Sequence, residues 1–374
     1  MAHAYTPGLK VTERATVRKT RRLPILGEVL VEQGQKVTPE VIVARTKIPG
    51  NPNTVNVANA LGLEPEDIEH FMVKKLGDQV HKDEVLALYK AFFGLFKHYA
   101  RSPVEGVVEH ISPVTGQVTL REPPIPVQID AYLTGTVSEV LPREGVIIET
   151  AGAFIQGIFG VGGETQGEVK VVVNKADDVL DADLITNADK GKVLVGGSLI
   201  TAAALRKANE IGVSGLVAGG IIDKDLVEFL GYDIGVAITG HEDINSTVII
   251  TEGFGQMKMA DKTFSLLKDL AGWNASINGA TQIRAGVMRP EIIVPEFKPK
   301  HAAVAQGSLA EGMVPGTPIR VIREPYFGLL GEVVDLPPEL QIIETGAHVR
   351  ILRAKLADGR TVTIPRANVE IIEG

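Results

Sequence analysis

The chain has 374 residues and a formal net charge of −8; 44% of its residues are hydrophobic and 22% are charged. This balance predicts a folded globular protein of about two to four domains and excludes a largely disordered chain. Because the chain has no cysteine, disulfides, thiolate metal sites, iron–sulfur clusters and thiol catalysis are excluded.

The chain carries no signal for crossing a membrane. No stretch approaches the roughly 18 consecutive apolar residues that a membrane-spanning helix needs, and the N-terminus lacks the apolar core of a signal peptide. We therefore expect a soluble, cytoplasmic protein without membrane contact. The acidic net charge does not favour nucleic-acid binding over the whole surface, because phosphates are bound through Lys and Arg.

Residues 1–22 are polar and basic, and they are expected to form an N-terminal arm. Two interpretations stay open: an exposed arm or first strand of the body, and an arm that binds nucleic acid or a partner. The cations of this segment are Lys10, Arg14, Arg18, Lys19, Arg21 and Arg22.

Residues 23–166 have short, glycine-punctuated apolar runs that predict a β-rich domain. The segment Gly34–Ala44 aligns without gaps with Gly77–Ala87. Each copy has a glycine turn, a valine, polar residues and an apolar strand that ends in alanine. Between the copies, the apolar residues of Val55–Val73 predict a helix that starts near Pro65.

The second copy, followed by Ser102–Val108, resembles the biotinyl/lipoyl-like barrel-sandwich hybrid fold over about 50 residues. Carrier members of that family place a modified lysine in a tight hairpin, whereas Leu88–Tyr99 is long and rich in aromatic residues. Lys90 or Lys97 as a prosthetic-group site is therefore the less favoured alternative, and no cofactor is expected. The resemblance implies a docking or scaffolding module, whose aromatic cluster forms core or a partner-facing plug: Tyr89, Phe92, Phe93, Phe96 and Tyr99.

Residues 167–295 alternate between strand and helix patterns, which predicts an α/β domain with a mainly parallel sheet and right-handed crossovers. The expected strands are 192–195, 214–218, 235–238 and 247–250. The expected helices are 199–211, a second that runs to Leu230 with Asp223 as its N-cap, and 257–270.

The strand ends of this domain are rich in glycine and small polar residues. Ligands bind at the carboxyl ends of strands in open α/β sheets, so a small-molecule site is one interpretation; the other is that the turns need glycine for their geometry alone. The candidate ligand-binding residues are Gly196, Gly197, Ser198, Gly219, Gly220, Thr239, His241, Glu252 and Gly253. No nucleophile motif or metal-ligand spacing accompanies them, so we assign no catalytic residue and no metal.

Residues 296–315 form a linker, and residues 316–374 carry the most specific pattern of the chain. Short strands are expected at 349–352, 362–365 and 369–372, with a hairpin at Asp358-Gly359. The segment Gly316–Val334 resembles the KOW motif of SH3-like barrels, and the matching residues are Gly316, Val321, Pro325, Tyr326, Gly328, Gly331 and Val333. This resemblance covers about 59 residues.

A KOW domain implies contacts with RNA, polymerase or ribosome. From Gly316 onward, however, the sequence has seven basic and eight acidic residues, so it lacks the excess of positive charge that is typical of RNA binding. Arg350, Arg353 and Lys355 could still form a local basic stripe. Protein–protein docking is the favoured interpretation of this domain.

The fold class expected is thus multidomain: a barrel-sandwich hybrid, a mainly parallel α/β domain and a KOW barrel. The leading functional hypothesis is a non-enzymatic adaptor or scaffold subunit that works through protein partners, with a homo-oligomer also compatible. The alternatives are a ligand-sensing or enzymatic α/β domain, and a KOW factor associated with RNA, transcription or translation.

Overall fold

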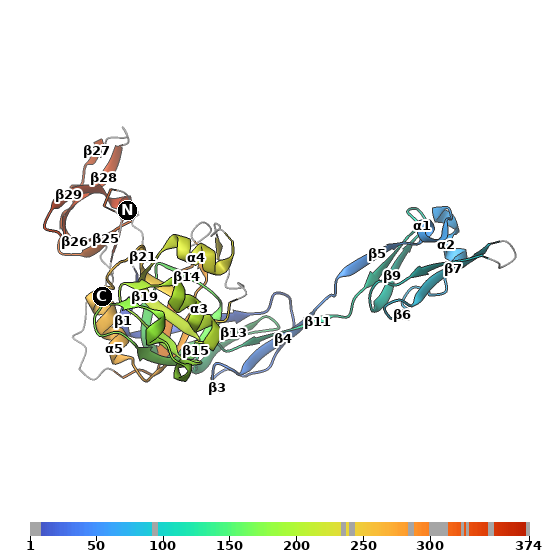
Figure 1. Cartoon of the computed structure of the whole chain (residues 1–374), viewed down its shortest axis with the longest axis horizontal. Coiled ribbons are helices and arrows are strands. Elements are labelled where there is room, and N and C mark those ends of the chain that lie inside the picture. Colours follow the sequence, from blue (N-terminus) through green and yellow to red (C-terminus); the bar gives the residue numbers. More distant parts are fainter. Residues whose placement is uncertain are drawn as a thin grey trace.

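The structure is a computed structural model, and it describes residues 9–91, 96–232, 237–238, 244–282, 288–298, 313–322, 325–326, 329–342 and 348–371. The fold is mostly β, with 49% of the described residues in strands and 15% in helices. Figure 1 shows an elongated molecule with three parts. We call them the body (9–48 and 125–298), the stalked module (49–124) and the C-terminal module (313–371).

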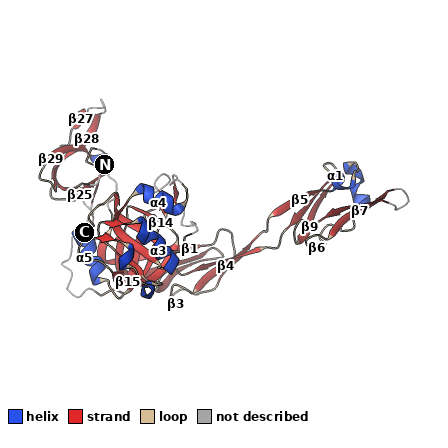
Figure 2. Cartoon of the chain, viewed as in Figure 1, coloured by secondary structure: helices blue, strands red, loops and turns tan. Residues whose placement is uncertain are grey.

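Four adjacent strands towards one edge of the body sheet run parallel, and the edge strand β14 (Phe159–Val161) pairs antiparallel with β21 (Thr247–Phe254). The four, in spatial order, are β15 (Glu164–Val171), β17 (Val193–Val195), β19 (Gly215–Ile221) and β21. Helices cover both faces of this part of the sheet; Figure 2 shows them in blue beside the red strands. The helices are α3 (Ala202–Ile211), α4 (Asp223–Leu230) and α5 (Asp261–Asp269).

The two faces of the sheet carry separate hydrophobic cores, because successive strand side chains point to opposite faces. Leu194 and Leu216 pack with residues of α3 and α4. Val193 and Val217 pack instead with residues of α5. The helices therefore segregate by face, with α3 and α4 on one side and α5 on the other.

Beyond β15 the sheet continues in antiparallel strands. These strands are β22 (Asn274–Asn278), β24 (Glu291–Pro295), β13 (Gly145–Gln156), β12 (Gly135–Leu141) and β3 (Lys36–Val37). The basic segment near the N-terminus is part of this sheet: β1 (Val11–Arg22) pairs with β13 from Val11 to Arg22. Residues 11–22 are thus a strand of the body.

Helix boundaries differ from those expected where tertiary hydrogen bonds intervene. Leu199–Ile200 form a strand, β18, and α3 begins only after Thr201, whose hydroxyl accepts from the Ala204 amide at 3.1 Å. Asp223 is the first residue of α4 and not its N-cap. The third helix begins at Asp261 because the Met257 amide donates to Ser198 and holds residues before the helix against the neighbouring loop.

The stalked module is an insertion between two paired strands of the body. Strand β4 (Ile42–Ile48) leaves the body and β11 (Ile125–Asp130) returns to it, and their register runs from Ile42 opposite Asp130 to Ile48 opposite Ile125. The module has its own core, in which Leu61, Ile68 and Leu120 are fully buried. Figure 1 shows it at the far end of this two-stranded stalk.

A four-stranded sheet, a hairpin and two short helices build the stalked module. The strands are β5 (Pro52–Asn56), β6 (Gln79–Val80), β9 (Gly106–Ser112) and β10 (Gln117–Arg121), with hairpin strands β7 (Val85–Ala91) and β8 (Phe96–Arg101). The helix expected to start near Pro65 is present as the 3₁₀ turn Pro65–Asp67 followed by α2 (Ile68–Phe71), and a separate helix, α1 (Val57–Leu61), precedes it. Gly62 ends α1 in the left-handed conformation.

The two similar segments of the sequence have the same backbone pattern. Gly34 and Gly77 both have positive φ, 85° and 88°. Their amides donate at 2.8 Å to the carbonyls of Val137 and Val108, and each valine amide donates back to the residue after the glycine, at 2.9 and 3.0 Å. One copy lies in the body and the other in the stalked module, so the stalk joins two related β units.

The C-terminal module is a six-stranded antiparallel sheet around a core that includes Ile319, Val333 and Leu352. Its strands are β25 (Pro318–Val321), β26 (Leu330–Asp335), β27 (Leu340–Ile342), β28 (His348–Leu356), β29 (Thr361–Pro365) and β30 (Val369–Ile371). The expected Asp358-Gly359 turn joins β28 and β29, with Gly359 at φ 88°.

Candidate functional site

The glycine-rich strand ends expected to bind a ligand are filled by neighbouring backbone. A side chain at Gly219 would meet the Met257 carbonyl at 2.1 Å, and one at Gly220 would meet the Gly255 carbonyl at 2.0 Å. Gly196, Gly197 and Ser198 are buried as well. Their small size allows strands and loops to pack closely, which is a sufficient structural reason for these glycines.

Two of the predicted ligand residues, Thr239 and His241, lie outside the described residues. Ser198 is engaged by its own surroundings: its hydroxyl donates to the Asp177 carbonyl at 2.7 Å and accepts from the Gln256 amide at 3.2 Å. Gly253 has a φ of 150° within β21.

Glu252, the only acid in the predicted ligand set, is buried in a contact between the body and the C-terminal module. It forms an ion pair with Arg320 of β25, and its Oε1 accepts from the Ala260 amide at 3.0 Å. Arg320 also contacts Glu370 at 3.3 Å, and Glu370 contacts Arg289 of the body at 3.1 Å. The Arg320, Glu252 and Glu370 side chains are at most 5% exposed.

This cluster, which we call the ion lock (Glu252, Arg289, Arg320 and Glu370), takes part in attaching the C-terminal module. Buried charges are tolerated only when they are paired and hydrogen-bonded. Within the described residues, Nε of Arg320 is the one buried side-chain nitrogen or oxygen without a partner. Sequence reasoning missed the lock because its members are far apart in the chain.

Most residues of the KOW-like motif have structural roles. Val321 and Val333 are buried in the module core, and Tyr326 packs against that core with Arg360 over its ring at 5.5 Å. Gly316 adopts a φ of 90° in a turn and Pro325 lies in an exposed turn. Gly331 lies in β26 beside the Lys355 carbonyl, and Gly328 lies outside the described residues.

The candidate basic stripe lies along β28. Arg350, Arg353 and Lys355 are all exposed. Arg353 and Lys355 alternate with the buried Leu352 and Ala354 on the outer side of the strand, and Arg353 lies 3.9 Å from Asp335. The stripe is therefore short and partly neutralised.

Most of the cations of β1 form ion pairs with carboxylates of the body. Arg18 pairs with Glu149, Lys19 with Glu291, Arg21 with Asp130 and Glu164, and Arg22 with Glu144. A phosphate would have to displace these pairs, and the one described β1 cation outside an ion pair, Arg14, is less free charge than nucleic-acid binding needs.

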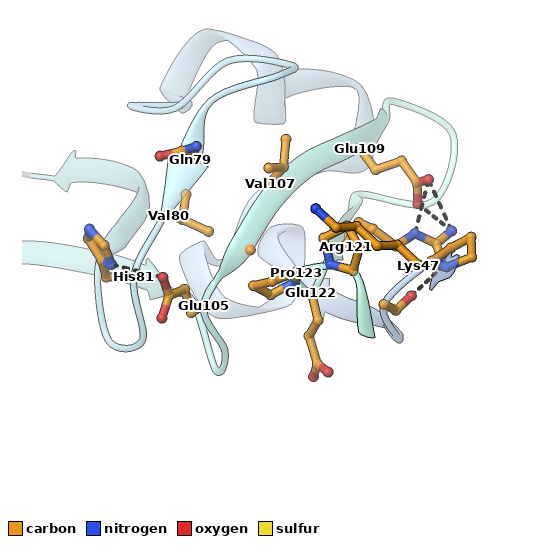
Figure 3. A pocket seen from close by; sticks show the side chains of 14 residues that line it. Lys47, Gln79, Val80, His81, Glu105, Val107, Glu109, Arg121, Glu122 and Pro123 are labelled. Atoms are coloured by element: carbon orange, nitrogen blue, oxygen red, sulfur yellow. Dashed lines mark hydrogen bonds and ion pairs between the residues drawn. The ribbon is translucent and has the colours of Figure 1, made fainter. Parts of the chain in front are cut away.

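A pocket of about 670 Å³ lies where the stalk meets the module (Figure 3). Arg121 is held in it by Glu109, with 2.8 Å from Nη2 to Oε2, and it donates to the Gly50 carbonyl at 2.9 Å. On the other side, Nδ1 of His81 lies 3.8 Å from Glu105. The arginine of this pocket is already paired, Lys47 is a second lining cation, and the lining residues include no nucleophile–base pair.

The hairpin β7–β8 combines cations with exposed aromatic groups at the far end of the stalked module. Lys90 and Lys97 are cross-strand neighbours, and between Val85 and Arg101 the sequence has no acidic residue. The side chain of Phe96 is 60% exposed and that of Tyr99 is 42% exposed. Like charges directly opposite each other destabilise a sheet, so the fold alone does not account for this lysine pair.

Some residues of the aromatic cluster that was predicted to form core or a partner-facing surface pack in the module, and others are exposed. Tyr89 packs edge-on against Phe71 at 5.0 Å and stacks on His98 at 6.2 Å, next to the module core. Phe96 and Tyr99 are on the surface. Phe92 and Phe93 lie outside the described residues.

Among the described residues, no group of three or more His, Asp or Glu side chains is placed to hold a metal ion. No helix in the described part of the chain has the length and apolar character that crossing a membrane requires.

No protein-family model matches the chain, and no curated protein is significantly similar to it. Its function is therefore inferred from its own geometry.

Proposed function

We propose that the chain is a non-enzymatic adaptor or scaffold subunit that docks protein partners through its stalked module. One observation carries this proposal: the module has its own core and is joined to the body by the β4–β11 stalk, at the far end of an elongated molecule. A folded unit held away from the rest of its chain is accessible to other macromolecules from most sides.

The docking element in this proposal is the β7–β8 hairpin. Exposed Phe96 and Tyr99 supply the aromatic area that dominates many protein interfaces. Lys90 and Lys97 favour a partner surface with carboxylates, which would also relieve the repulsion between the two ammonium groups.

The family resemblances are retained as proposals. The repeated glycine-turn pattern of Gly34 and Gly77 supports a barrel-sandwich hybrid origin for the units at the two ends of the stalk. The buried positions of Val321 and Val333 support a KOW-type, SH3-like C-terminal module. The pairing of the β1 cations favours protein docking over RNA binding.

The experiment compares partner capture by the full chain with capture by a chain that lacks the module. Because Ile48 and Ile125 face each other at the end of the stalk, residues 49–124 can be replaced by an Asn-Gly turn, which suits a two-residue hairpin. Each protein is used for affinity purification from native lysate after nuclease treatment, and retained proteins are quantified by mass spectrometry. We expect a partner set that the full chain retains and the shortened chain loses.

A charge-reversal pair locates the contact within the module. The double variant Lys90→Glu/Lys97→Glu should lose the same partners, while the matched double variant Lys75→Glu/Lys82→Glu, at exposed positions of the same module, should retain them. Partners that persist after removal of the module would refute the proposal. Recovery of RNA-bound complexes that nuclease abolishes would favour the RNA-associated alternative instead.

A further inference from the structure

A large cleft lies in the body where β13 changes neighbours. On the same side of β13, β12 pairs with residues up to Glu149 and β24 pairs from Gly152 onward. At the transition, the Ala151 carbonyl accepts from the Glu296 amide at 2.8 Å. The pairing of β12 with β13 ends where the pairing of β24 begins, and the cleft lies between β12 and β24. The cleft has a volume of about 1140 Å³.

Three cations from separate elements line this cleft: Arg14 of β1, Lys36 of β3 and Lys298 after β24. All three are exposed, and none belongs to an ion pair within the described residues. One of the two lining carboxylates, Glu149, lies 3.3 Å from Arg18 and is thus already neutralised. The cleft therefore has an excess of uncommitted positive charge.

Hydroxyl and aromatic groups complete the lining. The hydroxyl groups come from Thr16, Thr38, Thr134, Thr136, Ser138 and Thr150. Trp273 is 37% exposed and is held edge-on by the buried Phe297, with ring centroids 5.4 Å apart. A partly exposed indole that is fixed from behind can stack on the ring of a ligand.

The backbone at this cleft is strained. Glu296 has a φ of 58°, which is uncommon for a residue with a side chain. Residues held in such conformations concentrate at binding and catalytic sites. Glu296 directly precedes Phe297 and Lys298, two of the residues that line the cleft.

We propose that this cleft binds a small ligand that carries both an aromatic ring and a phosphate chain, which is the chemistry of a nucleotide. Lys36, Lys298 and Arg14 neutralise the phosphates, threonine hydroxyl groups donate hydrogen bonds to them, and Trp273 stacks on the ring. The site is separate from the strand-end residues Gly196–Ser198, and it does not depend on docking through the stalked module.

Trp273 is the only tryptophan of the chain, so intrinsic fluorescence reports directly on this cleft. The purified full chain is titrated with ATP, with AMP and with inorganic triphosphate, and calorimetry provides a second readout. We expect saturable binding of ATP, weaker binding of AMP, and weaker binding of every probe as ionic strength rises. Lys36→Ala and Lys298→Ala should each raise the Kd for ATP about tenfold, as expected for loss of a charge-assisted hydrogen bond.

Two further variants keep the result interpretable. Lys224→Ala removes the same charge from an exposed position on α4 and should leave the Kd unchanged. Trp273→Phe should weaken ATP binding in the calorimeter but leave triphosphate binding largely intact. Absence of saturable binding would overturn the proposal, and so would equal weakening by Lys224→Ala and Lys36→Ala.

Discussion

The stalked module and the C-terminal module are attached to the same body by different physical means. The stalked module is connected twice, through β4 and β11, and main-chain hydrogen bonds join these strands along the stalk. The C-terminal module is connected once, and four charged side chains of the ion lock contribute to its contact with the body. The first attachment holds a module at a distance, whereas the second holds a module against the body.

The difference shows how an insertion can be both ordered and independent. A stalk of paired strands fixes the orientation of the module relative to the body through main-chain hydrogen bonds, without a side-chain interface between the two. A module on a single linker needs a specific contact to have a defined orientation, and we expect the buried ion pairs of the lock to supply that contact. We therefore expect mutations to act locally in the stalked module and on domain arrangement in the C-terminal module.

The largest effect is expected from Arg320→Ala, because it leaves Glu252 buried without its cation. Breaking a buried pair by removal of one partner costs about 3–5 kcal/mol. Chemical denaturation should show this loss, and limited proteolysis should release the C-terminal module. The exposed pair of Arg206 and Glu228 is the matched control, and Arg206→Ala should cost less than about 1 kcal/mol. Equal effects in the two variants would contradict a structural role for the lock.

Leu120→Ala tests whether the stalked module unfolds as its own unit. Leu120 is fully buried in the module core, and truncation of a buried leucine costs about 2–5 kcal/mol. Hydrogen exchange should accelerate in residues 52–121 while the body strands keep their protection. Loss of protection throughout the body would show that the stalk couples the two units.

The matched pair Gly34→Ala and Gly77→Ala compares the two related β units directly. Both glycines have positive φ and open space around the missing side chain, so the cost is that of the backbone conformation alone, about 1–2 kcal/mol. We expect Gly77→Ala to lower the unfolding midpoint of the stalked module only, and Gly34→Ala to lower that of the body only. Calorimetry can resolve the two transitions.

Tyr132 anchors the base of the stalk, and its removal should have a small, pH-dependent effect. It follows β11 with a φ of 66°, its carbonyl accepts from Ser276 at 2.7 Å, and its hydroxyl donates to Glu291 at 3.3 Å. Tyr132→Phe should cost on the order of 1 kcal/mol through loss of that hydrogen bond. The measurement is urea denaturation at neutral pH.

The ionisation of Tyr132 is also expected to make the stability of the native protein depend on pH in the alkaline range. Burial, followed by the charges of Glu291 and Glu164, raises the pKa of Tyr132 well above its usual value of 10.0. The unfolded chain therefore loses the phenolic proton first, so the stability that Tyr132 contributes is present below pH 10 and declines as pH rises above it. The stability difference between the native protein and Tyr132→Phe should change in this range, and a pH-independent difference would contradict the assignment.

Local patterns of the sequence determined much of the secondary structure. Turn glycines, apolar strands and the Asp358-Gly359 hairpin were predictable from the sequence because they depend on neighbours in the chain. The similarity of Gly34–Ala44 to Gly77–Ala87 was also predictable from the sequence alone. The start of α3 and the separate helix α1 were not, because Leu199–Ile200 pair as a strand with Val179–Leu180 and Ile221, and because the turn at Gly62 ends α1.

The tertiary structure decided everything that depends on residues far apart in the chain. Glu252 belongs to an ion lock and not to an open ligand edge, because β25 brings Arg320 from 68 residues away. The basic residues of β1 became ion-pair partners once β1 paired with β13. The stalk and the cleft beside Trp273 likewise arise from strand pairings between distant segments. Such pairings leave no local pattern, because their partners are chosen by packing and charge in the folded chain.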